Sequence, residues 1–397
     1  ISVAYMDPGN WATNISGGAK FGTALLWVIV LASLMAIGIQ IVAAKLGIAT
    51  GKGVAQLCRE QLPRSVVWVL WAAAELAMIA TDMAEIIGAA IGFSLIFQLP
   101  LWAGAILAGA SSFALLGVRT AYRQGFRWVE FTIMSLVGVI ALAFVFEMAL
   151  ARPTAGQVAA GLAPGIPNAS ALYLAIGILG ATVMPHSVYL HPTIVQDRRS
   201  RLIASEGDTE AVHRRHFRLE SIDTSLALFG AMFVNGAMLI VAAASLQGTG
   251  IETLEEAYVT LQSVFGANSS LAFGIALIAA GLSSSLVATM AGQTVMDGFL
   301  DLNVNVWLRR SVTLVPSLAV VIAGFDPTSV LVASQVALSF ELPFVLIPLL
   351  WFTYQEDLMG RFTNRRATTY GLAVVIGVIV VLNVWLLYST LFGGGAP

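Results

Sequence analysis

The chain has 397 residues, of which 58% are hydrophobic and only 11% are charged, and its mean hydropathy is +0.86. Soluble globular proteins carry about 25% charged residues, so this composition excludes a disordered chain, a water-soluble enzyme and a nucleic-acid binder with a basic face. The single cysteine, Cys58, excludes an intrachain disulfide and a metal cage built from cysteines, while the net charge of −2 decides nothing.

Apolar stretches long enough to cross a bilayer recur along the whole chain, which indicates an all-α polytopic membrane protein. A span needs about 20 mostly apolar residues, and residues 21–44 and 257–296 contain no Asp, Glu, Lys or Arg at all. Since apolar sequence begins at Ile1, we expect the first span to be a truncated helix. The eleven predicted spans cover residues 1–18, 22–46, 66–93, 99–118, 127–150, 171–196, 219–246, 268–298, 309–325, 328–352 and 368–391.

The basic residues fall in alternate loops, which sets the expected orientation of the spans. Cytoplasmic loops carry the excess of Lys and Arg, so we expect a multi-pass protein of the plasma or inner membrane, with its N-terminus in the cytoplasm and its C-terminus outside. Only Lys20 and Arg152 fall on the external side. The other 18 of the 20 basic residues fall on the cytoplasmic side: Lys45, Lys52, Arg59, Arg64, Arg119, Arg123, Arg127, Arg198, Arg199, Arg201, Arg214, Arg215, Arg218, Arg309, Arg310, Arg361, Arg365 and Arg366.

The first span is interrupted by Asp7-Pro8-Gly9-Asn10. In a soluble protein these residues are typical of a β-turn, but a turn here would place bare backbone in lipid, which is tolerated only where it is buried or lines a cavity. A helical proline cannot donate to the carbonyl four residues back, so Pro8 frees the carbonyl of Ala4, and it moves Asp7 off the helical region. We therefore predict a broken helix.

The third span carries Glu75, Asp82 and Glu85 among apolar neighbours. At about 100° per residue the three lie on one helix face, within about 80° of arc. Ionisable groups inside a span are costly and indicate an ion or proton path. Span 9 begins with Arg309 and Arg310, which could neutralise Asp82 and Glu85. The alternatives are a static ion pair, or arginines that only mark topology.

The sixth span contains the second interruption, Met184-Pro185-His186. Pro185 frees the carbonyl of Ala181 and moves Met184 off the helical region. His186 and His191 are five residues apart, about 140° around a regular helix, so they cannot share one metal ion there. We keep His186 as a candidate for proton transfer or gating and His191 as a weaker one, with structural hydrogen bonding as the alternative.

The interruptions begin spans 1 and 6, which divides ten of the spans into two halves of five. An odd number of spans per half makes the halves opposite in orientation, as in the inverted repeats of many secondary transporters, whose substrate lies between two broken helices at mid-membrane. We therefore treat residues 1–397 as one transmembrane domain, with a first repeat over 1–150, a second over 171–352 and an extra helix over 368–391.

Together the two breaks offer the Asp7 carboxylate, the Asn10 amide oxygen, the Met184 thioether and free peptide carbonyls. One negative charge among neutral donors suits a divalent cation. Mg²⁺ and Ca²⁺ prefer oxygen ligands alone, whereas sulfur favours softer transition ions. We predict a site for Mn²⁺ or Fe²⁺, with Co²⁺, Zn²⁺ and Cd²⁺ as further candidates; for Met184 the alternative is an ordinary packing residue.

The segment Met6–Asn10, with Met184–His186 five spans later, resembles the Nramp family of divalent-metal transporters, and the likeness runs through nearly the whole chain. The resemblance implies a LeuT-type fold that moves Mn²⁺ or Fe²⁺ with protons. It implies a salt-bridge proton route and a gating residue in span 2. The residues that it assigns to the metal are Asp7, Asn10, Met184, the Ala181 carbonyl, the Ala4 carbonyl in some conformations and Gln335 when the site occludes. Those that it assigns to the proton route and the gate are Asp82, Glu85, Glu75, an arginine of the Arg309–Arg310 pair, and Gln40.

The leading hypothesis is therefore a proton-coupled importer of divalent transition metals that works by alternating access. We expect metal ions, protons and the bilayer as its partners, with no nucleic acid and no resident cofactor; a monomer is compatible with the sequence. One rival is another LeuT-type transporter, for Mg²⁺ or an amino acid. A more distant rival is an intramembrane hydrolase that uses a serine of the run 283–285, which we interpret as helix packing because no His or Asp motif accompanies it.

Glu341 in span 10 departs from the expected pattern, since we expect a small or neutral residue at this position in relatives. The sequence leaves three interpretations open: a second proton carrier, a partner for an arginine, or a residue that faces a water-filled vestibule.

Overall fold

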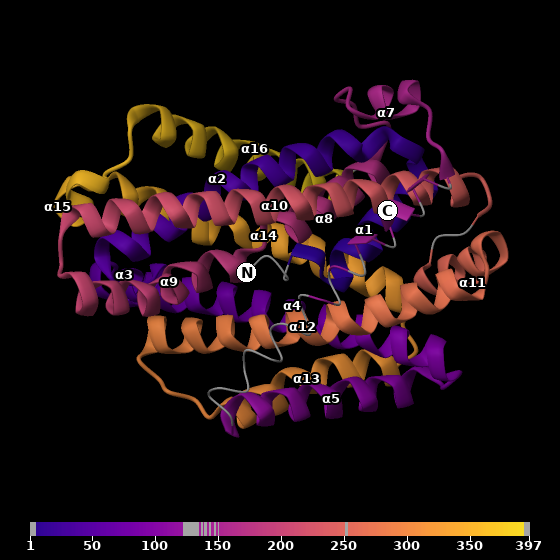
Figure 1. Ribbon diagram of the computed structural model, residues 1–397, viewed down its shortest axis with the longest axis horizontal. Helices are drawn as coiled ribbons and strands as arrows, with labels where there is room; N and C mark the ends of the chain where they lie inside the picture. The colour runs from indigo at the N-terminus through magenta and orange to yellow at the C-terminus, as the bar shows by residue number, and fades with distance from the viewer. Residues whose placement is uncertain are drawn as a thin grey trace.

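The computed structural model describes residues 5–121, 151–250 and 253–392, together with positions 135, 138, 141–142, 144–146 and 148–149. Over these residues every regular element is a helix (Figure 1). In chain order the helices are α1 (Pro8–Phe21), η2 (Gly22–Leu25), α2 (Leu26–Thr50), α3 (Val54–Gln61), α4 (Arg64–Phe97), α5 (Leu101–Ala121), α7 (Ala155–Gly161), α8 (Ala169–Val183), α9 (Pro185–Glu206), α10 (Glu210–Leu246), α11 (Leu254–Phe265), α12 (Ala267–Leu300), α13 (Val306–Ile322), α14 (Pro327–Tyr354), α15 (Glu356–Met359), η3 (Gly360–Phe362) and α16 (Arg366–Phe392).

The predicted spans coincide with these helices wherever the structure describes them. Within the described part of the chain, seven stretches are long and apolar enough to cross a membrane, and α5 contains a shorter apolar helix. One stretch joins α1 to α2 and another joins α8 to α9. The predicted span over 127–150 lies almost wholly outside the described residues. The prediction of an all-helical polytopic membrane protein is confirmed.

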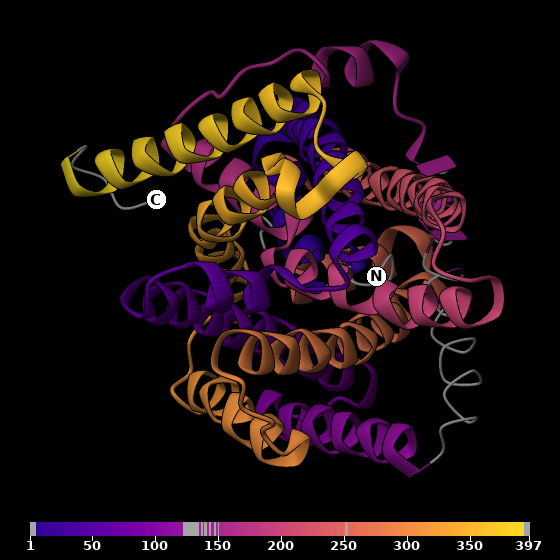
Figure 2. The ribbon, with the colours of Figure 1, turned by 90° about the vertical axis from the view of Figure 1, so that its left-hand side faces the viewer.

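Most of the long helices run side by side, with the two interrupted segments in the middle of the bundle (Figures 1 and 2). α4 packs along α12, α1 along α10, and α8 along α14. α5 and α13 form a pair at one edge, and α16 lies at the opposite edge (Figure 1). The helices that carry the two breaks are therefore enclosed by the rest of the bundle.

Close helix contacts depend on glycines, as the abundance of small residues predicts. A Cβ on Gly281 of α12 would lie 2.6 Å from the Glu85 carbonyl oxygen of α4. A Cβ on Gly88 of α4 would overlap the ring of Pro8 in α1. These backbones can approach only because the glycines have no side chain, and the contacts hold α1 and α12 against α4.

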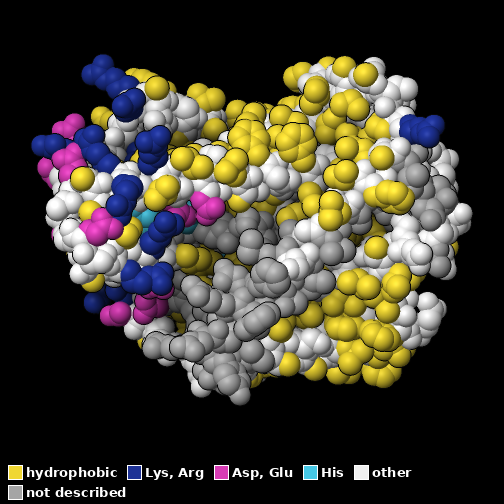
Figure 3. All heavy atoms as spheres, viewed as in Figure 1, with side chains coloured by type: hydrophobic (Ala, Val, Ile, Leu, Met, Phe, Trp, Pro, Cys, Tyr) yellow, Lys and Arg dark blue, Asp and Glu magenta, His cyan; other side chains and the backbone are white. Residues whose placement is uncertain are grey.

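Most of the exposed basic side chains gather at one end of the molecule (Figure 3). Figure 3 shows them over α3, α9, α15 and the start of α10, while yellow side chains cover most of the coloured surface between the two ends. Several are paired with acids at this end: Lys52 with Glu60, Arg59 with Asp301, and Arg361 with Glu210. We call this the basic end. Its charge reflects the alternate basic loops of the sequence.

The second interruption has the predicted form. α8 ends at Val183, and Met184 takes a left-handed backbone conformation with φ 50° and ψ 92° before α9 begins at Pro185. A positive φ is uncommon for a residue other than glycine, so the break is a defined feature of the backbone and not a gentle kink. It leaves the Ala181 carbonyl without a helical donor, because Pro185 has no N–H.

At the first interruption, Pro8 is the first residue of α1 and Asp7 is its N-cap. Tyr5 and Met6 form a short 3₁₀ turn before it, so a β-turn over residues 7–10 is excluded. Ala4, whose carbonyl we expect to be free, lies outside the described residues.

Candidate metal site

The Asp7 carboxylate is fixed at the start of α1 by the helix itself. Its Oδ1 accepts hydrogen bonds from the backbone N–H of Asn10 at 2.8 Å and from the Asn10 side-chain amide at 2.7 Å. This is the usual N-cap arrangement, in which a side-chain oxygen satisfies a free N–H of the first turn. The second oxygen, Oδ2, is buried and has no hydrogen-bond partner. The cap therefore orients one oxygen and leaves the other available.

Asn10 connects the two broken helices. Its Nδ2 also donates to the Ala181 carbonyl at 3.0 Å, across 171 positions of sequence. Met184, three residues further along, is completely buried, and its sulfur accepts a long hydrogen bond of 3.9 Å from Ser187. The predicted ligands Asp7, Asn10 and Ala181 therefore lie within direct reach of one another, with the Met184 break at the same level.

Gln335 of α14 lies against this group of residues, and it can do so because two neighbouring positions are glycines. A Cβ on Gly9 would collide with the Gln335 side chain, and one on Gly180 of α8 would collide with the Gln335 carbonyl oxygen. The Gln335 amide nitrogen donates to Ser334 at 3.1 Å, while Oε1 is buried without a partner. Gln335 thus packs directly on the backbone between Pro8 and Asn10.

Three buried oxygens around this point lack a donor: Asp7 Oδ2, Asn10 Oδ1 and Gln335 Oε1. Buried polar atoms in proteins are nearly always hydrogen-bonded, so each exception needs an explanation. Carboxylate and amide oxygens are ligands that bind divalent cations. No three His, Cys, Asp or Glu side chains of the described residues form a metal-binding group, so these donors amount to one carboxylate with neutral amides, carbonyls and a thioether. That set suits a divalent ion with some affinity for sulfur.

The arginines of α13 form only one of the two ion pairs with the acidic residues of α4 that the sequence predicts. Arg310 pairs with Asp82 at 2.5 Å, and both side chains are buried. Arg309, however, pairs with Glu75 at 2.9 Å and not with Glu85. Both carboxyl oxygens of Glu85 are buried without a partner. The expectation that the two arginines neutralise Asp82 and Glu85 is therefore correct only for Asp82.

The Arg310 guanidinium is held by two serines that the sequence analysis did not connect with it. Ser112 of α5 accepts from Arg310 Nε at 3.0 Å, and Ser285 of α12 accepts from Nη2. The two hydroxyls are 2.7 Å apart. Interpreting the run 283–285 as helix packing alone is therefore wrong for Ser285. A serine inside an apolar helix gives no sequence signal of the distant residue that it contacts.

The two histidines of α9 lie in different surroundings. His186 Nδ1 is 3.3 Å from Thr81 Oγ1 on α4. His191 Nδ1 is 2.8 Å from Gln40 Oε1 on α2, and its Nε2 is 3.1 Å from Glu220 on α10. Gln40 and His191 were predicted separately as candidate gating residues, and the structure brings them into contact. Glu220, which lies at the start of the predicted span over 219–246, was not predicted as a partner of His191, because the contact joins two separate helices.

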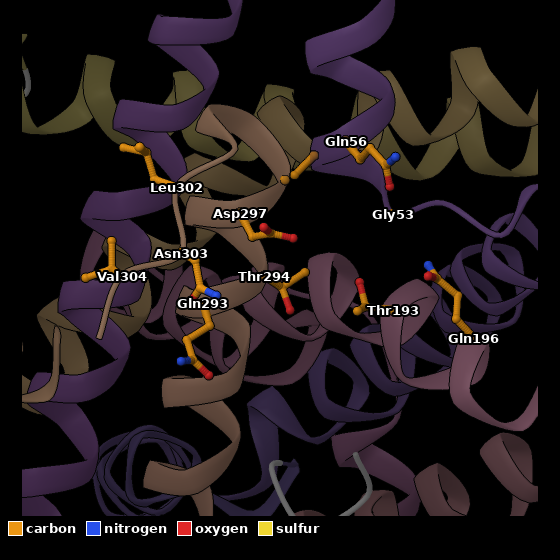
Figure 4. A pocket seen from close by; sticks show the side chains of 12 residues that line it. Gly53, Gln56, Thr193, Gln196, Gln293, Thr294, Asp297, Leu302, Asn303 and Val304 are labelled. Carbon is orange, nitrogen blue, oxygen red and sulfur yellow. The ribbon is translucent and has the colours of Figure 1, made fainter. Parts of the chain in front are cut away.

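A cavity of about 360 Å³ lies apart from these residues, at the basic end. Figure 4 shows Gln293, Thr294 and Asp297 of α12 facing Thr193 and Gln196 of α9 across it. Its lining is polar. The nearby Arg59 guanidinium donates a hydrogen bond to the backbone carbonyl of Asp297 at 3.0 Å, but its ion pair is with Asp301 and not with the Asp297 carboxylate. The candidate metal site is buried in the bundle and does not line this cavity.

A family model described as natural resistance-associated macrophage protein-like (Nramp) matches residues 1–389. A protein of Deinococcus radiodurans named divalent metal cation transporter MntH is 44% identical over 395 residues, which cover 99% of this chain and 88% of that protein.

Two solved structures are informative. The crystal structure of the Eremococcus coleocola manganese transporter, in complex with an aromatic bis-isothiourea substituted compound, has a TM-score of 0.86 and 32% identity, and the match covers 100% of this chain and 87% of that one. The structure of MhsT with L-phenylalanine has a TM-score of 0.62 at 16% identity, and the match covers 98% and 97% of the two chains. The second likeness shows the fold alone.

Proposed function

This chain belongs to the natural resistance-associated macrophage protein-like (Nramp) family, and we propose on that premise that it imports divalent transition-metal ions, chiefly Mn²⁺ and Fe²⁺, together with protons. The observation that carries the proposal is the set of three buried oxygens without donors, at Asp7, Asn10 and Gln335, beside the break at Met184. The names of the similar proteins, a divalent metal cation transporter and a manganese transporter, support the same substrate class.

The donor set favours a metal ion over the other substrates that a LeuT-type fold could carry. An amino acid would bring its own carboxylate to Asp7, and two carboxylates repel each other in a buried site. A Mg²⁺ carrier gains little from the Met184 thioether, because that ion prefers oxygen and keeps several waters. The family and the relatives are transporters, so a hydrolase is not supported.

We place transport in an alternating-access cycle between two inverted repeats, residues 1–150 and 171–352. The paired breaks at the start of α1 and between α8 and α9 support this division, because substrates of such folds bind between discontinuous helices. The basic end would face the cytoplasm by the positive-inside rule. The polar cavity between α9 and α12 at that end would then receive the released ion.

Asp82 with Arg310, and Glu75 with Arg309, form the proton route that we propose, with Glu85 and His186 between this route and the metal. The ion pairs supply groups that can exchange protons across α4 and α13. A divalent ion that arrives at Asp7 adds two positive charges nearby, which favours loss of protons from neighbouring acids. The membrane potential, worth about 2.3 kcal/mol per charge per 100 mV, drives both cations inward.

Uptake of Mn²⁺ into proteoliposomes, with the internal pH recorded at the same time, tests the proposal directly. The protein should carry Mn²⁺ inward and acidify the interior, and Asp7→Ala should abolish the uptake because it removes the one charged ligand. Asp301→Ala is a suitable control, since it removes a carboxylate that is paired with Arg59 at the surface. Equal uptake by Asp7→Ala and the parent would show that the site is assigned wrongly.

A further inference from the structure

Glu341 is a buried carboxyl group that the proposed metal site and proton route do not use. It lies on α14, and the residue is 4% exposed. The Tyr189 hydroxyl of α9 donates to its Oε1 at 3.0 Å, while its Oε2 is buried without a partner. Of the three interpretations that the sequence leaves open, the structure excludes an arginine partner, because no ion pair reaches Glu341 within the described residues.

Among the described residues, no ion pair supplies a compensating cation to Glu341. Tyr189 is 1% exposed and packs edge-on against Phe299 at 5.7 Å, and Cys58 of α3 belongs to the same apolar cluster. On the helices packed against α14, the other buried charged groups and the half-buried Glu75 are engaged elsewhere or belong to the proposed metal site and proton route. They are Lys45, bonded to Asn364; Glu75 and Asp82, paired with arginines; Glu85, Asp7 and His186 near the metal; and His191, bonded to Gln40 and Glu220.

A carboxylate buried among apolar side chains without a cation is costly, and this cost favours the neutral carboxylic acid form of Glu341. The position of Glu341 relative to the metal site indicates what the proton on its carboxyl group could do. Glu341 follows Gln335 by six residues on α14, which is about 9 Å along a helix, and Tyr189 follows Met184 by five residues on α9. The pair therefore lies on the side of the metal site that faces the basic end, and each partner is carried by a helix that bears a metal donor.

We propose that Glu341 is a second proton-carrying residue of the transport cycle, separate from Asp82 and its arginine. The inference rests on the proposed function. While α9 and α14 are in contact, the carboxyl group holds a proton that hydronium in the entering water has donated, leaving a water molecule behind. When the two helices separate to release the ion, water reaches Glu341, its O–H bond breaks and the proton passes to that water. The carboxylate is reprotonated when the site next opens to the other side.

The test compares Glu341→Gln with the parent in proteoliposomes, with Mn²⁺ uptake and internal pH measured together. Glutamine has the shape of the neutral acid but cannot exchange a proton, so Mn²⁺ binding should stay within about twofold of the parent. The number of protons moved per Mn²⁺ should fall about twofold. Glu60→Gln, which removes a carboxyl group at the surface beside Lys52, should keep the parental ratio.

Tyr189→Phe supplies an independent readout that does not remove the carboxyl group. The donated hydrogen bond favours the ionised acid, so its loss should move the pH of half-maximal Mn²⁺ uptake upward by about half a unit to one unit. If Glu341→Gln fails to elute as a folded protein from size exclusion, this shift decides the question.

The possible failures are distinguishable. A parental proton-to-metal ratio in folded Glu341→Gln overturns the second proton site and leaves the proposed function standing, as does an unchanged pH profile in Tyr189→Phe. A parent protein that carries Mn²⁺ without any protons overturns both this inference and the proton coupling on which it rests.

Discussion

Gly9→Ala should weaken metal binding without altering any proposed ligand. A Cβ at Gly9 would lie only 2.8 Å from Gln335 Cγ and closer still to the side-chain amide. The obstacle is a flexible side chain, so α1 can keep its position while Gln335 swings away. Alanine is also a better helix former than glycine, and helix α1 itself should not suffer.

The expected loss of Mn²⁺ affinity follows from the loss of Gln335 as a ligand. Displacing Gln335 removes one neutral oxygen from a divalent ion, and a hydrogen bond to a charged group, the nearest measured analogue, is worth about 1.5–3 kcal/mol. At about 1.4 kcal/mol per tenfold, the dissociation constant for Mn²⁺ should rise by roughly 10- to 150-fold. Gln335→Ala should cause a similar loss.

The assay is calorimetric titration of the purified parent, the two single variants and the double variant with Mn²⁺. If Gly9→Ala acts by moving Gln335, the double variant should bind within about twofold of the weaker single variant, since the same ligand is lost once. Gly17→Ala is the matched control on the same helix, because its Cβ would make an ordinary contact of 3.6 Å with Leu25. Parental affinity in Gly9→Ala, or losses that add in the double variant, would refute the reasoning.

Two further predictions concern the sulfur ligand and the buried ion pair. Met184→Ala should lower the preference for Mn²⁺ and Cd²⁺ over Ca²⁺ and Mg²⁺ by removing the soft donor, which competition uptake measures; an unchanged preference would contradict a role for the thioether. Arg310→Gln should destabilise the protein by about 3–5 kcal/mol, because it leaves Asp82 buried and uncompensated, whereas Arg309→Gln should cost less since its partner Glu75 is 21% exposed. Unfolding in detergent compares the two, and an equal loss would show that burial does not set the cost.

Much of the candidate site can be read from local sequence because proline acts locally. Pro8 and Pro185 each remove a backbone donor and restrict the preceding residue, so the start of α1 at Asp7 and the break at Met184 follow from a few residues. The Ala181 carbonyl is a consequence of the same rule, and the structure pairs it with Asn10. Gln335 has no such signal, and only the family resemblance indicated it.

The pairing of charges was less predictable than their presence. The face shared by Glu75, Asp82 and Glu85 follows from helical periodicity, but the partner of each depends on how far α13 slides along α4. The structure sets that register so that Arg309 meets Glu75 and Arg310 meets Asp82. Likewise, no pattern in the sequence links Ser285 to Arg310 or Tyr189 to Glu341, since each contact joins separate helices.

The sequence by itself determined that the chain is a bundle of membrane helices, that two of them are interrupted, and which end is basic, because hydropathy, proline geometry and charge are properties of short segments. Only the tertiary structure decided which arginine pairs with which acid and, among the residues that it describes, which buried oxygens lack donors and that Glu341 contacts a tyrosine and no cation. Those outcomes depend on the register and spacing of helices far apart in the chain, which the packing of the whole bundle fixes at once.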